Sequence, residues 1–206
     1  MLAQERWSQL WQQFGVARPA AELFAELQGH YAEPWRAYHT AEHIGECLGH
    51  FDPVRGLCQR PAEVEMAIWF HDAIYDPRRS DNEERSAEWA LAALAAAGVA
   101  MPVRHRVYAL IMATAHDAPP QTVDEQFIVD IDLAIFGQPP ARFDQYEAQI
   151  RQEYRWVPEL VFHSRRVELL RTFLARERIY STDYFYTRLE SAARENLNRS
   201  LARMVT

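Results

Sequence analysis

The sequence has few glycines and lacks runs of alternating β-branched residues. Only 7 of the 206 residues are glycine, and we find no segment of alternating β-branched residues bounded by turn signals, which is the signature of a strand. No apolar run is long enough to cross a bilayer, because the most apolar stretch, Trp89 to Met101, is short and rich in alanine. The sequence therefore predicts neither a sheet nor a membrane-spanning segment.

The chain is also poor in cysteine and in clustered positive charge. Cys47 and Cys58 show no metal-type or redox spacing, so we expect two ordinary reduced thiols. The net charge is -7, and no basic cluster is longer than Pro77-Arg78-Arg79, which argues against a nucleic acid polymer as partner. A small phosphorylated molecule, a nucleotide among them, remains a reasonable partner, because one or two arginines and a metal ion can neutralise it.

The N-terminus and the length indicate a simple organisation. Residues Met1 to Phe14 contain charged side chains and no uninterrupted apolar segment, so they do not resemble a signal peptide. We therefore expect a cytoplasmic protein without membrane attachment. A chain of 206 residues without a linker or repeat predicts one domain, residues 1–206. The oligomeric state does not follow from the sequence.

Helical periodicity and helix start signals recur along the chain. An apolar stripe that includes Leu2 and Phe14 predicts an opening helix, and two capping-box patterns, Ser80 with Glu83 and Thr122 with Glu125, predict two others. The expected helices cover residues 2–14, a short segment after Pro19, 34–50, a segment after Pro61, 80–98, a segment from Pro102 toward His116, 122–137, and segments from about Pro140, Pro158 and Ser181. The sequence predicts an all-α protein, a single-domain multi-helix bundle.

Histidines and acidic residues interrupt three of these apolar segments. His39 and His43 are four residues apart, a spacing that puts both rings on one face of a helix, although an isolated pair of this kind is more often a surface or core pair. The adjacent His71 and Asp72 stand in an apolar run without a local Lys or Arg. Burial of a charged aspartate requires a partner or a metal ion, and the alternative is a structural His-Asp hydrogen bond at a helix end.

A third interruption places Asp130 and Asp132 in a hydrophobic helix. Residues two apart on a helix point in different directions, so only one of the two need be a ligand, and the sequence does not decide between them. Two imidazoles and two carboxylates form a nitrogen and oxygen set that suits Mn²⁺, Fe²⁺, Co²⁺, Ni²⁺ or Mg²⁺. Thiolate ligation is not expected, because neither cysteine falls beside these residues.

These residues resemble the HD superfamily of metal-dependent phosphohydrolases, in which a histidine, a His-Asp doublet and a distant aspartate on helices bind the metal. The resemblance implies an HD-type helical domain with His43, His71, Asp72 and Asp132 as metal ligands. The segment from Tyr38 to His43 is similar to the opening motif of cyclic nucleotide phosphodiesterases, which implies that His39 is the general acid.

More of the chain is similar to a bacterial subgroup of predicted HD phosphohydrolases without a settled substrate. The similar stretches are residues 38–48, 67–87, 128–137, 151–154 and 190–197. His116 is a candidate for a second ion or an outer position, although a histidine at a helix end is its simpler interpretation.

The resulting hypothesis is a metal-dependent phosphohydrolase that cleaves a small phosphate ester or nucleotide by attack of a metal-activated water, with His39, Asp72 and Asp132 in catalytic roles. Whether it is a phosphomonoesterase, a phosphodiesterase or a pyrophosphohydrolase is not resolved by the motif. Two alternatives are an HD-type di-iron oxygenase, which needs additional histidine ligands, and a non-catalytic module that binds a metal and a nucleotide.

Overall fold

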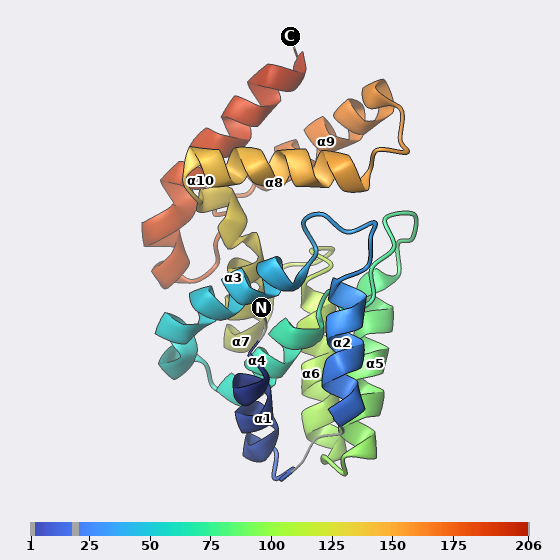
Figure 1. Ribbon diagram of the computed structural model, residues 1–206. Coiled ribbons are helices and arrows are strands. Elements are labelled where there is room, and N and C mark those ends of the chain that lie inside the picture. The colour runs from blue at the N-terminus through green and yellow to red at the C-terminus, as the bar shows by residue number, and fades with distance from the viewer. Residues whose placement is uncertain (1–2, 18–20, 206) are drawn as a thin grey trace. The chain divides into compact units, whose positions relative to one another are not determined.

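A computed structural model describes residues 3–17 and 21–205 (Figure 1). This part of the chain contains helices and no strand, which confirms the prediction of an all-α protein. The helices form two compact units, divided between Val129 and Asp130. The expectation of a single domain over residues 1–206 stays a prediction.

The first unit is built around one apolar helix, α4. The unit contains α1 (Gln4–Gln13), α2 (Ala21–Tyr31), α3 (Ala41–Phe51), the 3-10 helix η1 (Asp52–Leu57), α4 (Pro61–Phe70), α5 (Asn82–Ala96), α6 (Met101–Ala113) and most of α7 (Val123–Asp132). All residues of α4 from Glu63 to Phe70 are buried, and the helix contacts α1, α3, α5 and α6. Pro61 stands in the first turn, where its missing N–H costs nothing.

Aromatic side chains fill the core of this unit on one side of α4. The Trp7 ring on α1 packs against Trp11, Trp69, Phe24 and Phe70, with ring centroids 5.5, 5.2, 5.8 and 5.9 Å away. This confirms the predicted apolar stripe of the opening helix within the described residues. Leu2 of that stripe and Pro19, the expected start of the second helix, lie outside them.

The two predicted capping boxes have different outcomes. Thr122 and Glu125 form one, because the Glu125 N–H donates to Thr122 Oγ1 at 3.2 Å and the Thr122 N–H donates to Glu125 Oε2 at 3.1 Å.

The box predicted at Ser80 is wrong, because α5 begins at Asn82 and no side chain caps it. The Asn82 side chain instead bonds the backbone of Asp76, accepting at 3.0 Å and donating at 3.0 Å, and this holds the preceding loop closed. Gly98 ends this helical segment with φ of +77°, as expected for a glycine that follows a helix.

The second unit begins at the end of α7 and continues with short and long helices. It contains η2 (Leu133–Gly137), α8 (Pro140–Glu153), α9 (Glu159–Leu174) and α10 (Asp183–Val205). The last three start within two residues of the predicted positions, whereas the helix predicted over 122–137 is divided into α7 and η2. The long α10 packs against η2. Gly137 permits this approach, because a Cβ atom there would lie only 2.6 Å from the Cβ of Leu189. Among the helices described here, none combines the length and apolar character that a membrane span requires.

Trp7→Ala should lower the free energy of unfolding by about 3–5 kcal/mol, because it opens a cavity among four aromatic rings. Urea denaturation followed by circular dichroism measures this change. Leu57→Ala is the matched control in the same unit, since Leu57 is 55% exposed and its truncation removes little packing. Equal losses from the two variants would show that the aromatic cluster is not the core of the unit.

Candidate metal centre

The first part of the site is the N-terminal half of α3. Thr40 caps this helix by accepting a hydrogen bond from the Glu42 N–H at 3.3 Å. His43 follows on the buried face of the helix and is 2% exposed. Because the helix starts after Thr40, His39 precedes it, and the prediction that His39 and His43 share one helical face is wrong.

The second part of the site is the C-terminus of α4. This helix ends at Phe70, and His71 is its capping residue, whose backbone N–H still donates to the Ala67 carbonyl at 2.9 Å. Asp72 follows in a turn. The expectation that the doublet lies on a helix is therefore wrong for Asp72. The helix end directs both side chains toward His43.

Hydrogen bonding fixes the proton on the His71 ring. His71 Nδ1 lies 3.0 Å from the Ile68 carbonyl oxygen. A carbonyl oxygen only accepts, so Nδ1 donates, and in the neutral ring Nε2 carries a free electron pair. Metal-binding histidines are commonly held by such a bond from the other ring nitrogen. His71 is 3% exposed, so this electron pair is directed into the interior of the protein.

Three donor atoms of the first unit converge on one point. His43 Nε2 lies 3.2 Å from His71 Nε2, and Asp72 Oδ2 lies 3.3 and 3.1 Å from these two nitrogens. Ligand atoms about 2.1 Å from one ion are about 3.0 Å apart at a right angle and about 3.4 Å apart at the tetrahedral angle. The observed separations therefore fit a common metal ion.

The charge of Asp72 supports the same interpretation. Burial on its own would raise the pKa of this carboxyl, but the neighbouring imidazoles of His71, His39 and His43 outweigh it and hold the pKa well below its usual range. Asp72 Oδ2 is buried, and the ring nitrogens of His43 and His71 lie 3.3 and 3.1 Å from it. A buried carboxylate oxygen of this kind is costly unless it binds a cation.

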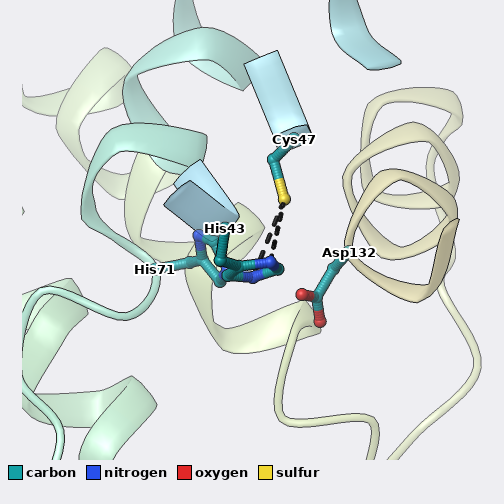
Figure 2. A group of neighbouring side chains, drawn as sticks. All are labelled: His43, Cys47, His71 and Asp132. Carbon is teal, nitrogen blue, oxygen red and sulfur yellow. Dashed lines mark hydrogen bonds between the residues drawn. The ribbon is translucent and has the colours of Figure 1, made fainter. Parts of the chain in front are cut away.

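Cys47 also lies beside the histidines, which corrects the expectation that neither cysteine does. Its Sγ is 3.7 Å from both Nδ1 and Nε2 of His43. Equal distances place the sulfur beside the ring rather than along either electron pair, so in this conformation it packs against the imidazole. The position of Cys47 one turn after His43 was the signal in the sequence. Figure 2 draws His43, Cys47 and His71 of the first unit, whose side chains are of the kinds that could hold a metal ion.

His39 reaches the same region without being on a helix. Its ring stacks on Tyr75 with centroids 4.1 Å apart and an interplanar angle of 26°. The ring centroid of His43 lies 6.1 Å away. His39 is half-buried, so its side chain is accessible to solvent, whereas His43 and His71 are buried.

Asp130 has a structural role within the second unit. Its carboxylate accepts hydrogen bonds from the Ser181 N–H at 2.8 Å, the Thr182 N–H at 2.7 Å and the Thr182 hydroxyl at 2.6 Å. These bonds join the end of α7 to the segment before α10 and use both carboxylate oxygens. Burial outweighs the bonds from Thr182 and Ser181 and raises the pKa of Asp130 to about 6.

Asp132 and His116 are the remaining predicted residues. Asp132 is the half-buried last residue of α7 and belongs to the second unit, so its role as the last ligand stays a prediction. His116 follows α6 with a left-handed backbone, φ 59°, a conformation typical of a residue that ends a helix. Its place at a second ion also stays a prediction.

Asp130→Asn should lower the free energy of unfolding by about 1–3 kcal/mol, because the NH2 group that replaces one carboxylate oxygen cannot accept the hydrogen bonds which that oxygen receives. Metal content should be unchanged. Chemical denaturation and metal analysis of the same preparation measure both quantities, with Glu177→Gln as a control at an exposed position of the same unit. Loss of metal at unchanged stability would make Asp130 a ligand instead.

The raised pKa of Asp130 predicts a pH dependence of stability. The folded pKa of about 6 exceeds the unfolded value, so the folded state binds more protons between the two values. The contribution of this carboxyl is therefore fully present below about pH 4 and is lost as the pH rises through about 6. Unfolding of the unchanged protein at several pH values should show this loss, and Asp130→Asn should remove it. An identical pH profile in both proteins would contradict the assignment.

Comparison with known proteins adds no relative to this description: no protein-family model, curated protein or solved structure matches the chain.

Proposed function

We propose that this chain is a metal-dependent phosphohydrolase acting on a small phosphate ester or a nucleotide. The observation that carries the proposal is the convergence of His43 Nε2, His71 Nε2 and Asp72 Oδ2 within 3.1 to 3.3 Å of one another. These atoms come from the start of α3 and the end of α4, far apart in the sequence.

The donor set indicates the type of cation. Two imidazole nitrogens and a carboxylate oxygen suit Mn²⁺, Fe²⁺, Co²⁺ or Ni²⁺, and Mg²⁺ with further oxygen ligands. In the proposed site Asp132 adds a second carboxylate. A bound cation would supply an activated water and neutralise charge on the phosphoryl group.

His39 has the properties of the proton donor. It is an imidazole, it lies near His43, and it is reachable from solvent. A protonated imidazole can donate a ring proton to the leaving oxygen of an ester. The stack on Tyr75 limits the rotation of its ring. In this proposal His39 donates, and Asp72 stays ionised as a ligand.

The burial of the donors favours a small substrate. His43 and His71 are almost fully buried, and the Asp72 side chain is 13% exposed. A single phosphoryl group can reach such a position more readily than the backbone of a long polymer. The net charge of -7 likewise gives no attraction for a polyanion.

The test uses the purified full chain, stripped of metal and supplied with Mn²⁺, Co²⁺, Ni²⁺ or Mg²⁺. Nucleotides and small phosphate esters serve as probes, and released phosphate or nucleotide is measured. We expect hydrolysis that depends on the metal. Asp72→Ala should lose both bound metal and turnover. His39→Gln should keep the metal and lose turnover by on the order of a hundredfold, whereas His105→Gln, an exposed position on α6, should be unaffected.

Full activity of Asp72→Ala would contradict the proposal. So would about two iron ions per chain with oxygen uptake, which would indicate an oxygenase. Binding of nucleotide without any hydrolysis in the presence of all four metals would indicate a binding module.

A further inference from the structure

Arg36 is a buried arginine between α2 and α3 whose guanidinium joins two segments of the site. Its Nη1 donates to the His39 carbonyl at 2.9 Å and to the Asp72 carbonyl at 2.7 Å, and Nη2 donates to the Ala73 carbonyl at 3.0 Å. The carbonyls of Asp72 and Ala73 follow the C-terminus of α4, where a positive charge is favourable. One side chain thus ties the backbone of His39 to the backbone of Asp72.

The donors of Arg36 are almost all used inside the protein. Nε donates to the Glu33 carboxylate at 2.9 Å, so four of the five N–H groups have protein acceptors. The side chain has 0% exposure. Arg36 therefore does not present a guanidinium to a phosphate in solvent, and its effect on the site must pass through the groups that it holds.

The aromatic neighbours of Arg36 extend the same connection to the His39 ring. The guanidinium carbon lies 5.3 Å from the centre of the Tyr31 ring and 5.4 Å from that of Tyr75. Tyr75 is the ring on which His39 stacks. The Tyr31 hydroxyl donates to the Trp69 carbonyl at 2.9 Å, which anchors this layer to α4. Arg36 thus supports both the backbone and the ring of His39.

We infer that Arg36 is a positioning residue that holds the imidazole of His39 in place beside the donor cluster. The inference rests on the proposed function for the role of His39, but its geometric content does not. Only a planar, forked cation can serve three carbonyls and a carboxylate at once, so lysine cannot replace it. Without the guanidinium of Arg36, the segment that carries His39 should become more mobile. The side chains of His43, His71 and Asp72 should still be able to bind a metal ion.

The first measurement needs no activity. In solution NMR, the unchanged protein should show ring-to-ring nuclear Overhauser effects between His39 and Tyr75. Arg36→Lys should lose them, while Arg79→Lys, on an exposed loop with a side chain 48% exposed, should keep them. Affinity for Mn²⁺ should change by less than about tenfold in both variants, because the three donor atoms remain.

The second measurement compares two phosphate esters that differ in their need for a proton. The alkoxide of an alkyl ester is a poor leaving group, so its departure should depend on a proton from His39. The p-nitrophenolate of a p-nitrophenyl ester can leave without a proton. Arg36→Lys should lower the rate on the alkyl ester by at least about tenfold more than the rate on the p-nitrophenyl ester. Combined with His39→Gln, it should cause little further loss, because both changes remove the same contribution.

If a folded Arg36→Lys protein keeps the nuclear Overhauser effects between the His39 and Tyr75 rings, the inference is wrong. Equal losses on both esters, or fully additive losses with His39→Gln, would also overturn it. If the unchanged protein hydrolyses no ester, the proposed function is wrong. The NMR comparison still tests the positioning role of Arg36, because it does not depend on activity.

Discussion

His43 Nε2, His71 Nε2 and Asp72 Oδ2 lie within 3.1 to 3.3 Å of one another in a buried part of the protein. The bond from His71 Nδ1 to the Ile68 carbonyl leaves His71 Nε2 as an acceptor, and Asp72 Oδ2 is an acceptor as well. Acceptors held at 3.1 Å repel each other unless a positive charge lies between them. A proton can serve this purpose for one pair, and a divalent cation serves all three atoms.

An acidic residue in an apolar helix is not by itself a sign of a metal site. Glu65 lies in the apolar helix α4 and is 1% exposed, yet arginines from distant segments, Arg6 and Arg55, bind its carboxylate. Asp130 is satisfied by Ser181 and Thr182. Asp72 differs, because its buried oxygen faces the imidazoles of His43 and His71 instead of arginines or backbone N–H groups. The partners of a buried acidic side chain, rather than its presence, therefore distinguish a structural residue from a candidate metal ligand.

Periodicity and proline positions in the sequence were sufficient to predict the helical fold. The stripe around Trp7, the start at Pro61 and the Thr122 capping box are local features, and local features set helix boundaries. The convergence of His43 with the His71-Asp72 doublet was also predictable from the residue types. Residue spacing predicted too early a start for α3. In the structure Thr40 accepts a hydrogen bond from the Glu42 N–H and caps the helix, so His39 lies before its first turn.

Other parts of the site depend on tertiary contacts that spacing does not encode. Arg36 shows no pattern in the sequence, since its acceptors are backbone carbonyls. The structural role of Asp130 depends on Ser181 and Thr182, which follow it by 51 and 52 residues in the sequence. Cys47 lies at helical spacing from His43, and its thiol contacts the His43 ring.

The most direct test is a crystal structure of the protein grown with Co²⁺, with diffraction data collected on both sides of the cobalt absorption edge. The account predicts one strong anomalous peak about 2.0–2.3 Å from His43 Nε2, His71 Nε2 and an oxygen of Asp72. A peak elsewhere, or its absence with the His71 to Ile68 bond intact, would contradict it.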